Sequence, residues 1–67
     1  MTAAQFELLE EDEATEVLRW RFEVLVRAGY DMEQSAVIAA HVEVGLHEAV
    51  QLIERGCDGE TALRILL

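Results

Sequence analysis

The residues of this chain best suited to metal chemistry are two histidines, His41 and His47, one cysteine, Cys57, and many carboxylates. Structural zinc sites usually take paired ligands, such as two cysteines about two to four residues apart. Here the histidines lie on either side of an expected turn, and Cys57 has no second cysteine to pair with. We therefore predict no metal site, and we expect the histidines to be surface or boundary residues.

Cys57 is also the side chain that most resembles a catalytic nucleophile. It follows a glycine at an expected helix end and precedes the next helix, a position that can activate a thiol. Nucleophilic catalysis needs a base and an orienting group as well, and the chain has no Gly-rich phosphate loop. A domain of this size also has little room for a catalytic cleft. We predict a protein that is not an enzyme, binds no cofactor, and packs Cys57 as a small apolar residue.

The charge of the chain disfavours several classes of partner. Its 67 residues include 14 carboxylates and only five basic residues, for a net charge of -9. Such a chain repels both a phosphate backbone and an anionic membrane surface. The longest apolar run, residues 36–40, is far shorter than the roughly 20 residues that span a bilayer, and a lone cysteine fits a reducing compartment. We expect a cytoplasmic protein that binds neither membranes nor nucleic acids.

Composition favours an all-α fold, a small bundle of three to four short helices. The chain is 52% hydrophobic, contains no proline and has four glycines, which is typical of helices joined by short turns. The first main helix should cover residues 14–28 and end at Gly29, because glycine adopts the left-handed backbone of a helix end at little cost. Asp31 and Gln34 have capping-box spacing and should begin a second helix.

Two further helices are expected after a break at residues 41–45. The next helix has the clearest helical period of the chain, with apolar residues at i, i+3, i+4 and i+7: Leu46, Ala49, Val50 and Ile53. Gly56 should end it, and Asp58 should cap a short last helix. The domain then spans residues 14–67, preceded by a flexible acidic tail over residues 1–13. That tail is either a solvated arm or, because Phe6 lies among its acids, a docking arm.

Residues 25–55 resemble a UBA-like domain, a compact three-helix module. The loop after the first helix, usually Met-Gly-Phe or Met-Gly-Tyr, is here Ala-Gly-Tyr at positions 28–30. The apolar residues of the expected helix after Gly45 stand at the core positions of the family's third helix. The sequence departs from the family at Ala28, at Gly45 in place of the usual capping Asn, and in having a fourth helix. The resemblance implies a small helical module that recognises another protein.

Large aromatic residues beside arginines are the leading candidates for partner binding. Aromatic and arginine side chains are enriched at binding hot spots, and Trp20 lies between Arg19 and Arg21 in the sequence. Tyr30, in the first joint, joins this set. At the chain end, the apolar run 65–67 must be covered, either by folding back beside Trp20 or by a second copy. The partner-binding candidates are therefore Arg19, Trp20, Arg21, Tyr30, Leu66 and Leu67.

The most consistent function is a non-enzymatic protein–protein interaction module, a small adaptor or regulator that acts through a helical surface. The identity of the partner protein does not follow from the sequence. One alternative is a structural homodimer, whose interface would include the apolar chain end. Another is a helix-turn-helix DNA-binding regulator, since residues 38–50 have that layout. Its would-be recognition helix carries Glu48 and Glu54, and the net charge opposes DNA binding.

Overall fold

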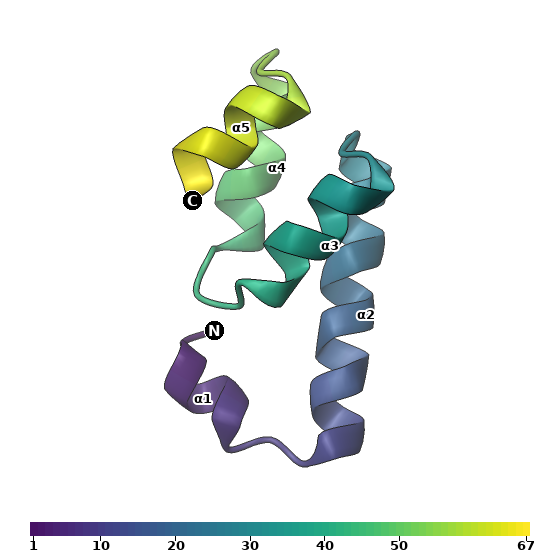
Figure 1. Cartoon of the computed structure of the whole chain (residues 1–67), viewed down its shortest axis with the longest axis vertical. Coiled ribbons are helices and arrows are strands. Elements are labelled where there is room, and N and C mark those ends of the chain that lie inside the picture. The colour runs from purple at the N-terminus through teal and green to yellow at the C-terminus, as the bar shows by residue number, and fades with distance from the viewer.

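The computed structural model describes every residue from 1 to 67 and contains five helices and no strand. They are α1 (Ala3–Glu7), α2 (Glu11–Ala28), α3 (Met32–Ala40), α4 (Leu46–Glu54) and α5 (Gly59–Leu66). The long α2 forms one side of the molecule, and α3, α4 and α5 gather beside its second half (Figure 1). The prediction of a small all-α bundle is therefore confirmed, with one helix more than the three to four expected.

The N-terminal segment has more regular structure than the expected tail. Thr2 and Gln5 form a reciprocal capping box, with hydrogen bonds of 3.0 and 3.1 Å, and this box begins α1. The long helix α2 begins at Glu11 rather than at residue 14, and its first turn carries three acidic residues. Negative side chains stabilise a helix N-terminus, so part of the acidic run belongs to the helix. α1 buries no residue and lies apart from the main bundle (Figure 1).

The joint between α2 and α3 is built as the sequence predicted. Gly29 has a φ of 125°, and its N–H donates to the carbonyl of Val26 at 3.2 Å. The N–H of Tyr30 donates to the carbonyl of Leu25 at 3.2 Å, which completes the double hydrogen bond of a Schellman helix end. Asp31 then caps α3, and it forms the expected capping box with the third residue of that helix.

The joint between α4 and α5 repeats this construction. Gly56 has a φ of 94° and donates its N–H to the carbonyl of Ile53 at 2.9 Å. Cys57 donates its N–H to the carbonyl of Leu52 at 3.0 Å, and the Asp58 carboxylate accepts the N–H of Thr61 at 2.8 Å. Both predicted helix ends and both predicted Asp caps are therefore confirmed.

The core lies where α2, α3, α4 and α5 meet. Its centre contains both small and large side chains: Ala49 of α4 and Ala62 of α5 are fully buried, as is Ile38 of α3. Small side chains let helix axes approach closely, and the larger residues then pack around them. The rest of the buried apolar cluster is Leu25, Tyr30, Ala39 and Val44.

The C-terminal helix packs in a different place from the one expected. α5 packs against α3 and α4 rather than beside Trp20 on α2. Ala62 enters the core, while Leu63 and Leu66 are half-buried against it. The joint at Gly56 turns the chain back, so that α5 packs on α4.

Candidate protein-binding surface

Arg21 was expected at the surface, and that expectation is wrong. Its side chain is only 4% exposed. The guanidinium donates to four backbone carbonyls: through Nε to Ala39 at 3.1 Å, and through Nη2 to Ile38, His41 and Val44 at 3.2, 3.0 and 2.8 Å. Arg21 thus joins α2 to the end of α3 and to the turn before α4.

The position and charge of Arg21 explain this role. It lies four residues before the buried Leu25 and three after Leu18, on the stripe of α2 that faces α3. The last turn of α3 contains no basic residue of its own, and a cation stabilises the negative end of a helix. Burial lowers the pKa of Arg21, and the carboxylate of Glu43 partly opposes that effect. Arg21 is therefore a structural cation of the core.

Tyr30 is likewise unavailable to a partner. It is 3% exposed, and its hydroxyl donates to the carbonyl of Ala49 at 2.8 Å. Burial raises the pKa of Tyr30. This hydrogen bond attaches the first joint to α4, so the aromatic residue of the loop stabilises the packing of three helices.

The three consecutive residues Arg19, Trp20 and Arg21 point in different directions, because each helical residue advances about 100° around the axis. Trp20 is 60% exposed and borders a depression of about 230 Å³ shared with Met1 and Leu46. Arg19 instead borders a groove of about 350 Å³ between α2 and α3. Arg21 borders the same depression as Trp20 but is buried, so the expected cluster of two exposed arginines beside the tryptophan is not formed.

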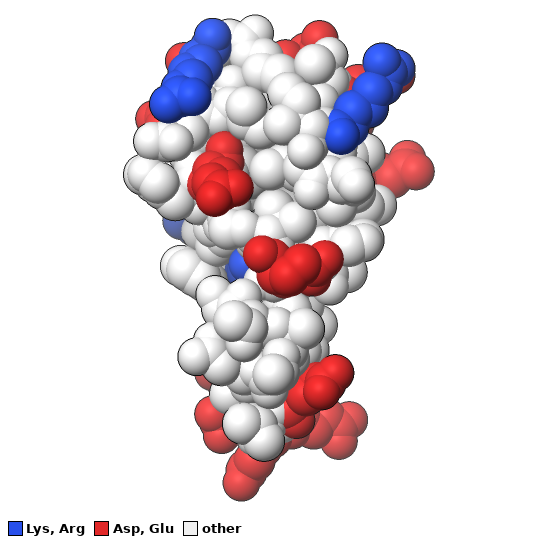
Figure 2. Space-filling model, turned by 90° about the vertical axis from the view of Figure 1, so that its left-hand side faces the viewer, with Lys and Arg blue, Asp and Glu red and all other residues white.

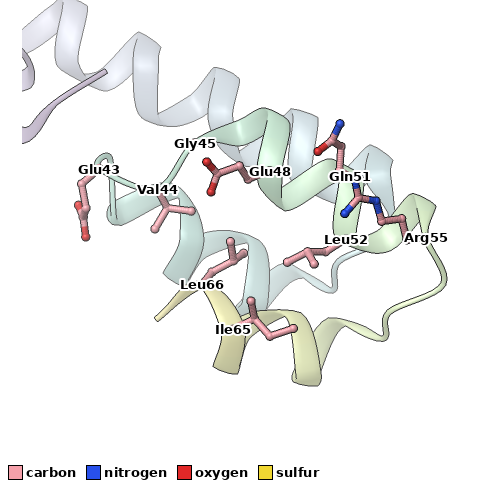
Figure 3. A pocket seen from close by; sticks show the side chains of 9 residues that line it. All are labelled: Glu43, Val44, Gly45, Glu48, Gln51, Leu52, Arg55, Ile65 and Leu66. Atoms are coloured by element: carbon pink, nitrogen blue, oxygen red, sulfur yellow. The ribbon is translucent and has the colours of Figure 1, made fainter.

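The largest groove of the molecule lies between α4 and α5, with a volume of about 440 Å³. We call it the α4–α5 groove. The side chains of Leu52, Ile65 and Leu66, from the two helices on either side of it, form its apolar part together with Val44 (Figure 3). The remaining lining residues are Glu43, Gly45, Glu48, Gln51 and Arg55.

Two of the large apolar residues at the chain end are exposed. Ile65 lines the groove and is 61% exposed, and Leu67, the last residue, is 54% exposed. Leu66 is half-buried. Of the sequence-predicted residues, Leu66 therefore lies in the groove, and Leu67 follows it directly in the chain.

Charged side chains stand at both ends of the α4–α5 groove. Glu43 and Glu48 lie toward one end and Arg55 toward the other (Figure 3). All three are exposed, and none forms an ion pair, since the one ion pair of the chain joins Arg64 to Glu60 at 3.0 Å. The face that includes α1, α4 and α5 shows a broad uncharged area broken by acidic side chains near its middle (Figure 2).

Most of the groove residues were missed from the sequence, although a signal for them exists. Glu48, Leu52 and Arg55 recur at i, i+4 and i+7, which marks a second stripe on α4 beside its core stripe. That stripe combines an acid, a leucine and an arginine, a mixture that differs from an ordinary solvated face. A leucine that lies between two charged residues on one stripe of a helix favours a protein-binding face.

The residues considered for metal chemistry do not converge. No group of three His, Cys, Asp or Glu side chains lies close enough together to hold a metal ion. The ring of His41 is exposed, and its Nδ1 donates to the carbonyl of Val37 at 2.8 Å. Cys57 is half-buried against the core, as expected for a small apolar residue.

Two further findings concern the chain as a whole. Its helices are either too short or too polar to cross a lipid bilayer. Comparison with protein-family models, with curated proteins and with solved structures gives no match. The α4–α5 groove and its surroundings are therefore the features of the molecule that bear on its function.

Proposed function

We propose that this chain is a non-enzymatic protein–protein interaction module, a small adaptor or regulator, that binds its partner through the α4–α5 groove. The observation that carries the proposal is the exposure of Ile65 in the α4–α5 groove, beside the apolar side chains of Leu52 and Leu66. Contiguous exposed apolar area on a small protein is typical of an interaction site. Burying one such side chain contributes about 1.5–3 kcal/mol, so a partner would gain most of its affinity here.

The resemblance of residues 25–55 to UBA-like domains supports the same class of function, because those domains recognise other proteins. In that resemblance, the sequence of α4 stands at the position of the family's third helix. Its exposed face carries Glu48 and Glu54, which favours a protein partner over DNA, since non-specific DNA affinity comes mainly from cations. We therefore prefer the interaction module to the helix-turn-helix alternative.

Affinity capture with matched variants tests this proposal. The bait is the full chain, either unchanged or carrying Ile65→Gln or Met32→Gln, incubated with extract of the native cells. Ile65 and Met32 are both exposed large apolar residues, but Met32 begins α3 and does not line the groove. Each variant loses one apolar side chain, and circular dichroism checks that both remain folded.

We expect the unchanged chain and Met32→Gln to recover the same partner, and Ile65→Gln to recover about a fifth as much or less, in line with the loss of one buried apolar contact. Equal recovery by all three baits would contradict binding through the groove. Loss with Met32→Gln alone would move the binding surface to the start of α3.

A further inference from the structure

The lining of the α4–α5 groove indicates the conformation of a ligand that would bind there. The protein has no β-strand, so an extended peptide has no sheet edge to join. The groove has no aromatic lining residue, whereas proline-rich peptides dock in aromatic-lined grooves. Among the modes built on secondary structure of the ligand, the one that fits is an amphipathic helix laid into a groove. α4 has nine residues, and at 1.5 Å per residue it is about 13 Å long, which matches two to three turns of a ligand helix.

The charges beside the α4–α5 groove indicate the charge of its ligand. Glu43 and Glu48 flank the apolar lining and have no ion-pair partner within the chain. The whole chain carries a net charge of -9. A second copy would bring two groove carboxylates for each Arg55, and like charges brought together oppose association. Basic side chains on the ligand would instead pair with these carboxylates, so charge complementarity favours a basic partner over a homodimer.

The same charges indicate in which direction a ligand helix would lie along the groove. Glu43 lies in the turn before α4, and Arg55 caps the C-terminal end of α4. The two charges therefore stand at opposite ends of the groove (Figure 3). A ligand helix with its basic residues toward Glu43 and an acidic residue toward Arg55 would satisfy both, whereas the reversed helix would place like charges together.

We infer that the occupant of the α4–α5 groove is an amphipathic helix of another protein whose apolar stripe is flanked by basic residues. This inference rests on the proposed function and specifies the chemistry of the partner. The apolar stripe packs on Leu52, Ile65 and Leu66, and the basic residues pair with Glu43 and Glu48.

Two synthetic peptides test the inference against the full-length chain. Each has about 14 residues, or about 21 Å when helical, with leucines at i, i+3, i+4 and i+7. The remaining positions are lysine in one peptide and glutamate in the other. Fluorescence anisotropy of the labelled peptides gives the Kd. We expect the leucine–lysine peptide to bind at least tenfold more tightly than the leucine–glutamate peptide, and its affinity to fall as salt rises.

Charge-matched variants separate the groove from the overall charge. Glu43→Gln with Glu48→Gln removes two carboxylates at the groove, and Glu11→Gln with Glu13→Gln removes two at the start of α2. We expect the groove pair to weaken binding of the leucine–lysine peptide about fivefold to tenfold, and the α2 pair to change it less than about twofold, since separated surface charges are screened. Ile65→Gln should also weaken it about tenfold or more.

Several outcomes would overturn the inference. These are an absence of leucine–lysine binding, equal weakening by the two charge-matched pairs, equal affinity for both peptides, and a doubled molecular mass of the protein alone, which would make a second copy the occupant.

The extract experiment separates the two proposals. If Ile65→Gln abolishes partner capture while the groove pair Glu43→Gln with Glu48→Gln does not, the proposed function stands and the basic helix fails. If neither change affects capture, both proposals fail.

Discussion

The molecule contains two helical hairpins with the same backbone joint, α2–α3 around Gly29 and α4–α5 around Gly56, but their surroundings differ. A Cβ added to Gly29 would lie 3.2 Å from Cγ2 of Ile53, while one added to Gly56 would meet nothing within 4 Å. The residue after Gly29 is the buried Tyr30, and the residue after Gly56 is the half-buried Cys57. The same local signal thus forms a joint with a buried tyrosine in one hairpin and, in the other, a surface joint without a buried residue.

This difference matters for function, because the α4–α5 groove lies within the hairpin that has the surface joint. α5 is held by the buried Ala62, by its half-buried leucines, and by close approach of Gly59 to the side chain of Gln34 on α3. The first hairpin is additionally joined by the buried hydrogen bonds from Arg21 on α2 to the carbonyls of Ile38 and Ala39 on α3. We therefore expect the first hairpin to act as the rigid support and the second as the side that can adjust to a ligand.

The largest expected difference in stability is between a substitution of Arg21 in the first hairpin and one of Arg64 in the second. Arg21→Met should lower the free energy of unfolding by about 3 kcal/mol, because buried carbonyls, including those of Ala39 and Val44, lose a charged donor. Arg64→Met removes one exposed ion pair and should cost less than about 0.5 kcal/mol. Urea unfolding followed by circular dichroism measures both. Similar costs for the two variants would mean that Arg21 does not join α2 to α3.

Alanine at the two joint glycines gives the next largest difference. Gly56→Ala should cost about 1–2 kcal/mol from left-handed backbone strain alone. Gly29→Ala carries the same strain and also presses its Cβ against Ile53, so it should cost about 1 kcal/mol more. Thermal melts of the two variants provide the comparison. An equal loss of stability would show that Ile53 moves aside freely, and a Gly29→Ala variant as stable as the unchanged protein would show that α2 does not end there.

The smallest expected effect is the pH dependence of the α5 cap. Hydrogen bonds from Thr61 lower the pKa of Asp58 below its ordinary value. A lowered pKa in the folded state contributes stability above the unfolded value of about 3.9, and that contribution is lost as the pH falls through the folded value. We expect α5 to lose order below about pH 4, and Asp58→Asn, which keeps a capping side chain, to lack this step. The Thr61 amide signal in an NMR titration measures it; an identical titration in the Asn variant would exclude Asp58 as the cause.

The helix ends were predictable because their signals are local. Gly29, Gly56, Asp31 and Asp58 act on backbone groups within a few residues, so their types and spacing are enough. α1 carries a similar local signal in Thr2 and Gln5, which the many acids of residues 1–13 obscured. Helix ends defined by caps can therefore be predicted from sequence where charge composition does not dominate the interpretation.

The candidate site was less predictable because it depends on which helix faces meet. Arg21 lies on the apolar stripe of α2, yet its charge and its neighbour Trp20 suggested a surface residue. Leu66 was predicted to bind a partner, but the groove that it lines forms only because α5 folds back onto α4. The position of α5 is set by packing between distant residues, which no spacing within one helix records.

Methyl NMR of the full-length chain with the leucine–lysine peptide tests the central claim most directly. We predict that the methyl signals of Leu52, Ile65 and Leu66 shift on titration, while those of Leu18 and Ala36, in the groove between α2 and α3, stay within error. Shifts at Leu18 and Ala36 with none at Leu52, Ile65 and Leu66 would contradict the account and place the binding surface on the first hairpin.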